Sequence, residues 1–161
     1  MMGKELVVDL YSEGDFLGYI SLLENTNYQE TAEAMEETEL CIIPTSDFNA
    51  LLNNNSEVSK KLIQLLAKNI SEKENHLLGL AYNSLRKKVA DALITLNKKY
   101  NTEKVENFSI DISRESLATI AGTATESLIR TLSEFKNEKL IAIKDGAIVI
   151  LNEKKLANLL N

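Results

Sequence analysis

The spacing of apolar residues along the chain changes near residue 44. Before that point, short apolar runs of β-type composition are separated by polar turns, one of them at Gly14. The runs cover residues 6–11, 16–23, 31–35 and 38–43. Pro44, the single proline, closes the last run. Short, closely spaced strands indicate part of an antiparallel barrel or sandwich, although so small a sheet needs a partner or a larger domain to cover its edges.

From residue 45 onward the apolar spacing becomes helical. Thr45 to Asp47 can cap a short helix, which three consecutive asparagines at residues 53–55 end. Residues 56–82 then predict one long helix, whose apolar positions alternate three- and four-residue steps if Lys73 occupies the missing place. The positions of this seam are Ile63, Leu66, Ile70, Leu77 and Leu80.

Two interpretations of the long helix stay open. It can pack on its own domain, or it can pair with the same helix of a second chain. The small sheet beside it cannot cover a helix of this length, which favours dimerisation.

The second half of the chain predicts short helices and strands in quick succession. The expected helices are residues 84–100, residues 114–121, Ala124 to Lys136 and a short C-terminal one. A strand is expected at residues 108–112, and a hairpin at residues 140–143 and 147–151. Asp145-Gly146 suits the turn of that hairpin, because both residues tolerate a positive φ.

The two consecutive helices have the pattern of a helix-turn-helix. Ser113 is a good N-cap for the first helix, and Gly122 lies where the chain must turn sharply. Thr123 followed by Glu126 fits a capping box at the start of the second helix. With the hairpin behind it, the segment predicts a winged helix-turn-helix that binds DNA. The alternative is a dimeric winged-helix module that contacts proteins and does not read DNA sequence.

The charge of the chain is divided unevenly. The net charge of −6 over 161 residues argues at first against a nucleic-acid partner. Residues 1–84, however, hold 5 Lys/Arg against 14 Asp/Glu, whereas residues 85–161 hold 13 against 10. The basic half therefore coincides with the predicted DNA-binding segment.

Several other classes of protein are disfavoured by the composition. One Cys excludes an intrachain disulfide and a Cys-ligated iron–sulfur cluster, and one His argues against a multi-His metal site. No apolar run approaches a membrane span and the N-terminus lacks a signal-peptide pattern, so we expect a soluble cytoplasmic protein. The sequence lacks a phosphate loop, a nucleophile elbow and a paired-His motif, which predicts that it is not an enzyme and needs no cofactor.

Specific segments resemble those of a known family. Residues 14–18 (Gly-Asp-Phe-Leu-Gly) resemble the glycine-rich start of a β-roll phosphate cassette, and residues 40–44 with 47–48 resemble its last strand and exit. The helix-turn-helix match is more specific. The chain thus resembles the Crp–Fnr family of bacterial transcription factors, the group of the cyclic-AMP receptor protein and the fumarate–nitrate regulator.

This resemblance implies an α+β fold in three parts. Residues 1–55 would form a partial cyclic-nucleotide-binding-type β-roll, the effector domain. Residues 56–83 would be the dimerisation helix, and residues 84–161 the winged helix-turn-helix. The first half of the family's β-roll has no counterpart here, so the chain is either a fragment of a longer protein or a naturally short form. The implied partners are a second copy of the chain, a two-fold symmetric DNA operator and RNA polymerase.

The outward residues of the second helix are the candidate base readers: Thr125, Glu126, Ser127, Ile129 and Arg130. In the family, the acid and the arginine four residues later usually read bases, and they fall on Glu126 and Arg130. Arg130 can bond a guanine bidentately, and Glu126 can accept from a cytosine amino group. The alternative for this pair is an i,i+4 salt bridge. Ile129 can touch a thymine methyl group or belong to the core, and Ser113, Arg114, Lys136 and Lys144 are candidate phosphate contacts.

The resemblance does not extend to the cyclic-AMP determinants. The remnant of the effector cassette is Gly18, Tyr19, Glu30, Thr31 and Ala32. Tyr19 stands where the cyclic-AMP-binding branch has the ribose-binding Glu, and Glu30 stands where it has the phosphate-binding Arg. A carboxylate repels a phosphate, so the sequence predicts against cyclic AMP. The lone His76 on the long helix is more typical of a surface residue than of a haem ligand.

Overall fold

The computed structural model describes residues 7–159, which form two units. Within the described residues, one unit is residues 13–71, and the other combines residues 72–159 with residues 7–12. The long helix α3 (Ser56–Tyr82) contributes residues to both. Each unit is described by itself.

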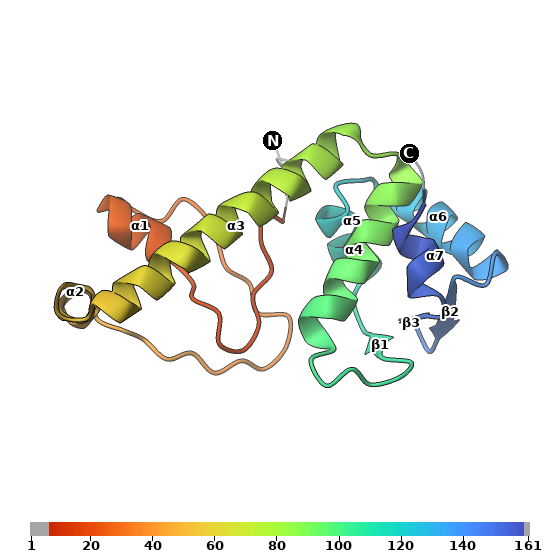
Figure 1. Ribbon diagram of the computed structural model, residues 1–161. Coiled ribbons are helices and arrows are strands. Elements are labelled where there is room, and N and C mark those ends of the chain that lie inside the picture. The colour runs from red at the N-terminus through yellow and green to blue at the C-terminus, as the bar shows by residue number, and fades with distance from the viewer. Residues whose placement is uncertain (1–6, 160–161) are drawn as a thin grey trace. The chain divides into compact units, whose positions relative to one another are not determined.

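The first unit is built mainly from helices (Figure 1). It holds α1 (Tyr19–Glu24), α2 (Thr45–Asn54) and the first part of α3. The buried Tyr19 side chain links α1 to α3, because its hydroxyl accepts a hydrogen bond of 2.6 Å from Asn69 Nδ2. Asn55, the last of the three predicted helix-breaking asparagines, caps α3 by accepting from the backbone N–H groups of Glu57 and Val58.

The strands expected before Pro44 do not form in the described residues 7–44. The run at residues 16–23 is instead partly helical as α1, and residues 31–43 have no regular secondary structure. Leu40 and Ile42 in that last segment are 70% and 86% exposed. A β-strand is stable only when a neighbouring strand takes up its backbone N–H and C=O groups, and the described residues provide no such neighbour. The start of the run at residues 6–11 lies outside the described residues.

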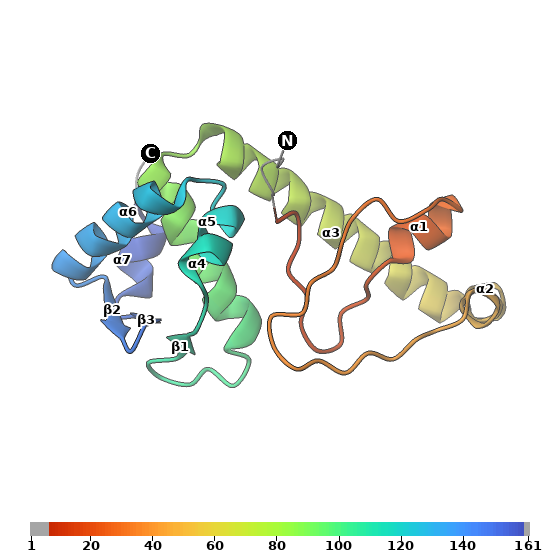
Figure 2. The same cartoon turned by 180° about the vertical axis from the view of Figure 1, so that it is seen from behind.

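The second unit is a winged helix-turn-helix (Figures 1 and 2). Its elements after α3 are α4 (Leu85–Tyr100), β1 (Ser109–Ile110), α5 (Arg114–Ile120), α6 (Thr125–Asn137), β2 (Ile141–Lys144), β3 (Ala147–Ile150) and α7 (Glu153–Ala157). The strands form one antiparallel sheet in the order β1-β3-β2. The predicted helices and hairpin are confirmed to within one or two residues, and the predicted strand at residues 108–112 is shorter.

The core of this unit lies where α4, α6 and the sheet meet. Leu93 of α4, Phe135 of α6 and Ile148 of β3 are fully buried. Their neighbours repeat at helical spacing, so each helix turns one apolar face inward. The helix α4 also packs against α5 and α7, which encloses it on several sides.

The hairpin turn has the geometry that its sequence predicted. Asp145 and Gly146 have φ values of 50° and 88°, the pair of positive angles typical of a type I′ turn. Ala142 of β2 lies opposite Val149 of β3 in the ladder. The wing is therefore a regular two-stranded extension beside the helix-turn-helix.

Candidate nucleic-acid interface

The turn between α5 and α6 is fixed by backbone hydrogen bonds. Ser113 caps α5 as predicted, its Oγ accepting from the Ser116 N–H at 3.0 Å. At the other end, the Thr123 N–H donates to the Ala118 carbonyl at 3.0 Å, while Gly122 has a φ of 61°. A Cβ on Gly122 would lie 2.7 Å from Leu80 Cδ2. Glycine therefore suits both the backbone angle and the close packing of α3 at this turn.

The predicted capping box at the start of α6 is wrong. The N-cap is Ala124, which makes no side-chain hydrogen bond. Thr123 lies one position too early, because its backbone completes the C-terminal turn of α5. The connection between α5 and α6 is too short for both the C-terminal turn of α5 and a capping box at Thr123. Only the C-terminal turn of α5 forms.

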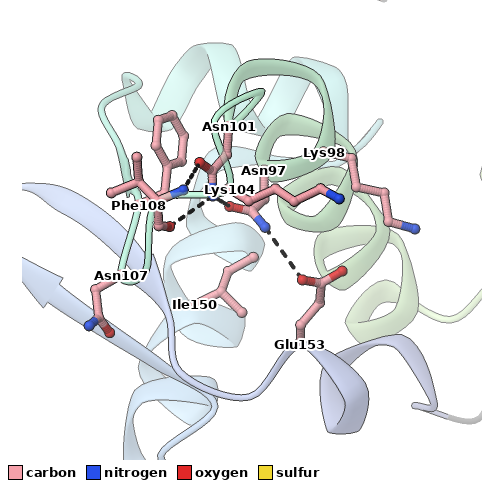
Figure 3. Close-up of a pocket in the computed structure, with 9 residues that line it drawn as sticks. Asn97, Lys98, Asn101, Lys104, Asn107, Phe108, Ile150 and Glu153 are labelled. Carbon is pink, nitrogen blue, oxygen red and sulfur yellow. Dashed lines mark hydrogen bonds between the residues drawn. The ribbon is translucent and has the colours of Figure 1, made fainter.

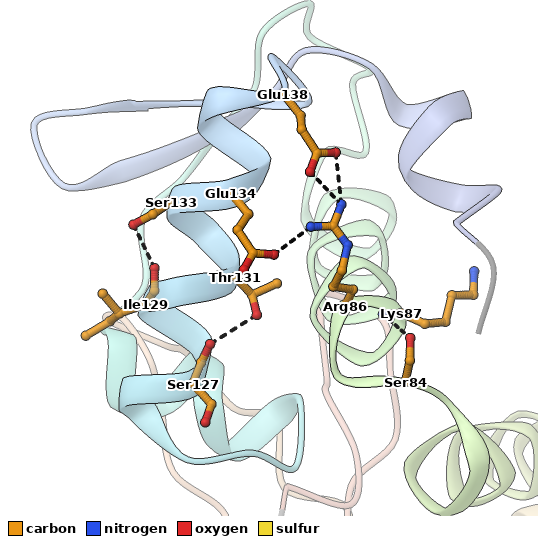
Figure 4. A network of polar contacts seen from close by, with 9 residues as sticks. All are labelled: Ser84, Arg86, Lys87, Ser127, Ile129, Thr131, Ser133, Glu134 and Glu138. Atoms are coloured by element: carbon orange, nitrogen blue, oxygen red, sulfur yellow. Dashed lines mark hydrogen bonds and ion pairs between the residues drawn. The ribbon is translucent and has the colours of Figure 1, made fainter.

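The helix α6 separates its residues into an inward and an outward face. Leu128, Thr131, Leu132 and Phe135 are buried. Among the candidate base readers, Glu126, Ile129 and Arg130 are exposed, and Thr125 and Ser127 are half-buried. Ile129 is 48% exposed and points away from α4 (Figure 4), so it does not belong to the core.

Glu126 and Arg130 do not pair with each other. In the described part of the chain no ion pair or hydrogen bond joins them, although they are four residues apart on α6. The salt-bridge alternative for this pair is therefore not formed. Both charged groups remain accessible to a ligand on the outward face.

The side chains of the candidate phosphate contacts differ in their exposure and in the hydrogen bonds that they already make. Lys136 and Lys144 are exposed at the end of α6 and the end of β2. Arg114 is half-buried, and its guanidinium donates to the Gly146 carbonyl at 2.7 Å. It therefore braces the tip of the wing against the start of α5. The Ser113 hydroxyl is engaged with Ser116 Oγ at 2.8 Å.

A polar cluster between α4 and α6 was missed at the level of sequence. Arg86 on α4 contacts Glu134 at 2.6 Å and Glu138 at 2.8 Å (Figure 4). Its guanidinium lies 5.0 Å from the centre of the Phe135 ring. Burial lowers the pKa of Arg86, but the hydrogen bonds and negative charges of the two carboxylates raise it above its usual value. The sequence did contain a signal for this cluster. Glu134 and Glu138 are two acids four residues apart at a helix C-terminus, an arrangement that a nearby cation stabilises.

The remnant of the effector cassette is not assembled around a ligand site. Gly18 and Tyr19 begin α1, and Gly18 lies against the Tyr28 ring. Glu30, Thr31 and Ala32 are exposed. No hydrogen bond or ion pair of the described residues joins these two groups.

A polar pocket of about 450 Å³ lies beside the C-terminal end of α4 (Figure 3). Hydrogen bonds join several of the residues that line it. Asn101 donates to the Val105 carbonyl at 3.0 Å and accepts from the Val105 N–H at 2.7 Å, and Asn97 donates to Glu153 at 3.5 Å. The two Asn101 bonds hold the loop that leads from α4 to β1, and the Asn97 bond joins α4 to α7.

The seam of α3 carries unburied apolar side chains. Ile63, Ile70 and Leu77 are 66%, 59% and 57% exposed, and Leu66 and Leu80 are half-buried. Lys73 in the same seam pairs with Asp9 at 3.4 Å. No residue of α3 is buried.

Two segments of the chain match known domain families, in agreement with this architecture. Residues 87–159 match the Crp-like helix-turn-helix domain, and residues 1–55 match the cyclic nucleotide-binding domain. The chain belongs to the Crp–Fnr family. The cyclic nucleotide-binding match supports the predicted type of the first domain, even though its strands are not formed in the described residues.

Individual Crp–Fnr relatives are similar over most of this chain. The transcriptional activator protein Anr of Pseudomonas aeruginosa is 22% identical over 98% of the chain, which covers 65% of that protein. The cyclic AMP receptor protein of Thermus thermophilus is 28% identical over 92% of the chain and is covered to 66%. The chain thus spans about two thirds of the length of these relatives.

Among solved structures, FixK2 from Bradyrhizobium japonicum superimposes with a TM-score of 0.65. The match has 22% identity and covers 73% of this chain and 59% of that one, which supports the Crp–Fnr fold. In the described residues, no helix is both long and apolar enough to cross a membrane. The same residues contain no cluster of three or more His, Cys, Asp or Glu that could hold a metal ion.

Proposed function

We propose that this protein is a sequence-specific DNA-binding regulator of transcription that acts as a homodimer. The observation that carries the proposal is the outward face of α6, where Glu126, Ile129 and Arg130 are exposed and unpaired within the described residues. An α-helix fits the major groove, and side chains near its N-terminus reach base edges. The family membership supports this use of the helix.

Each exposed residue matches a different chemical group of a base pair. The Arg130 guanidinium suits the O6 and N7 acceptors of guanine, and the Glu126 carboxylate suits the amino group of cytosine. Ile129 lies between them in the sequence and offers an apolar surface to a thymine methyl group. Thr125 and Ser127 would support these contacts, and Ser113, Arg114, Lys136 and Lys144 would position the helix on the phosphates.

Dimerisation would use the exposed apolar seam of α3. Ile63, Ile70 and Leu77 recur every seven residues, the spacing at which one helix packs along another. We therefore propose residues 56–83 as the dimerisation helix between a partial effector domain, residues 1–55, and the DNA-binding domain, residues 84–161. A two-fold dimer would place two recognition helices about one turn of DNA apart. RNA polymerase is the proposed partner at the promoter.

Regulation by cyclic AMP is not part of the proposal. Glu30 would place a carboxylate where a phosphate must bind, and the Tyr19 hydroxyl already accepts from Asn69. Cyclic AMP is therefore expected to leave the affinity for the operator unchanged. A fluorescence anisotropy titration with and without the nucleotide measures this.

Selection from a random pool of duplex DNA tests the proposed function. The full chain should enrich a two-fold symmetric sequence with half-sites about 10 base pairs apart. A gel shift then compares this operator with a scrambled duplex of equal length at two salt concentrations, and both affinities should fall as salt rises. Failure to enrich any sequence would contradict the proposal and favour a module that contacts proteins.

A further inference from the structure

The C-terminal end of α6 carries an unfavourable arrangement of charges. Glu134 and Glu138 are four residues apart, so they are neighbours on the helix surface and repel each other. They also lie at the end of the helix where the backbone dipole is negative. Without a cation between them, this end of the recognition helix would be destabilised.

Arg86 is that cation, and it comes from another helix. It follows the Ser84 N-cap in the first turn of α4 and reaches α6 across a separation of 48 and 52 residues in the sequence. One guanidinium nitrogen donates to Glu134 at 2.6 Å, and the other donates to both oxygens of Glu138 at 2.8 and 2.9 Å. The side chain lies between the two helices (Figure 4) and against the Phe135 ring.

The position of Glu134 matters for Arg130. The two residues are four apart on α6, so a free Glu134 carboxylate could pair with the Arg130 guanidinium. In the structure Glu134 points to Arg86 (Figure 4), and Arg130 has no ion pair among the described residues. The carboxylate that would compete with a guanine for Arg130 is thus occupied by Arg86.

We propose that Arg86 is a positioning residue for the recognition helix. By binding Glu134 and Glu138 it anchors the end of α6 to α4 and keeps Glu134 from pairing with Arg130. This inference rests on the proposed function, because it assigns Arg86 a part in the reading of DNA. It goes beyond that function by making specificity depend on a residue that does not touch the DNA.

The test measures the affinity for the selected operator divided by that for scrambled DNA. Arg86→Met should lower this ratio about tenfold, since the released Glu134 competes for Arg130. Adding Glu134→Gln to Arg86→Met should restore the ratio, because a neutral amide does not form that ion pair. Lys88→Met is the matched control: it removes one positive charge from the same helix and should leave the ratio unchanged.

Two results would overturn the proposal. One is an Arg86→Met ratio equal to that of Lys88→Met, and the other is an Arg86→Met/Glu134→Gln ratio as low as that of Arg86→Met alone. Arg86→Gln, which also lacks the positive charge, replaces Arg86→Met in both comparisons if the methionine variant does not fold.

A second measurement separates this proposal from the proposed function. The NMR signal of the Arg130 Nε–H group in the free protein should shift in Arg86→Met and return in Arg86→Met/Glu134→Gln. If the unaltered chain enriches no operator, the proposed function fails, whereas this signal still tests the Arg86 contact. An unchanged Arg130 signal in Arg86→Met would contradict the positioning role.

Discussion

At the scale of single residues, the outward face of α6 carries the candidate base-reading side chains. The buried stripe around Leu128 and Phe135 fixes which side of the helix faces the core. Arg130 is consequently exposed with its guanidinium unpaired in the described residues. Its proposed base-reading role can be probed by comparison with Lys144, a proposed phosphate contact.

Arg130→Ala is expected to lower the affinity for the operator by about 1–3 kcal/mol and to relax selectivity at one base pair of each half-site. The loss would follow from removal of the proposed bidentate contact to guanine. Competition binding with operators substituted at each position measures it. Lys144→Ala serves as the control, and it should weaken binding to all sequences alike. Equal weakening by Arg130→Ala at every sequence would refute the base-reading role.

Lys139 is a second informative residue, because it adopts a left-handed backbone angle at the end of α6. Its φ is 57°, and the Leu140 N–H donates to the Phe135 carbonyl at 2.9 Å, which completes a helix-ending turn. Lys139→Gly should raise the free energy of unfolding by about 1 kcal/mol, since glycine takes this angle without strain. Urea denaturation measures the change. Lys139→Ala keeps the Cβ and should give no such gain; if it stabilises equally, backbone strain is not the cause.

At the scale of elements, α3 differs from the other long helix, α4. Six residues of α4 are buried, whereas none of α3 is. A helix of 27 residues with no fully buried residue gains less from packing within its own chain than α4 does, and packing supplies most of the stability of helices in proteins. The exposed seam is the feature that a second copy would cover.

Ile70→Lys is expected to convert a dimer into a monomer at micromolar concentration, because it would bury a charge in the seam. Sedimentation velocity on the full chain checks the mass. The matched control is Ser71→Lys, the next residue, which is exposed and lies off the seam. A dimer that survives Ile70→Lys would place the interface elsewhere.

At the scale of the whole molecule, charge separates the chain into an acidic and a basic half. Residues 1–84 have a net charge of −9 and residues 85–161 a net charge of +3. The overall value of −6 is therefore a poor guide to what the basic half contacts. The positive charges of residues 85–161 alone should determine the electrostatic attraction to DNA phosphates.

Raising the salt concentration from about 50 to 200 mM is expected to lower operator affinity about 10³-fold, as for a dimer that neutralises about six phosphates. A series of anisotropy titrations gives the slope of log affinity against log salt. Lys144→Ala should make that slope shallower, and Lys60→Ala, an exposed change in the acidic half, should leave it unchanged. An affinity independent of salt would rule out the proposed phosphate contacts.

The sequence by itself determined the helix-turn-helix and its wing. Ser113 caps α5, and Asp145-Gly146 makes the turn of the hairpin, both as predicted. These signals are local: a cap or a turn acts over a few residues, so it can be identified without knowing the rest of the fold. The outward placement of Glu126 and Arg130 follows from helical periodicity in the same way.

Only the tertiary structure decided the features that depend on distant partners. The apolar runs before Pro44 have strand composition, yet strands need neighbours, and residues 31–43 remain without regular structure. The capping box at Thr123 was wrong because the end of α5 uses the same backbone. The ion pairs of Arg86 with Glu134 and Glu138 join two helices across about 50 residues of sequence. Hydrophobic periodicity does not indicate which charged residues meet across such a distance.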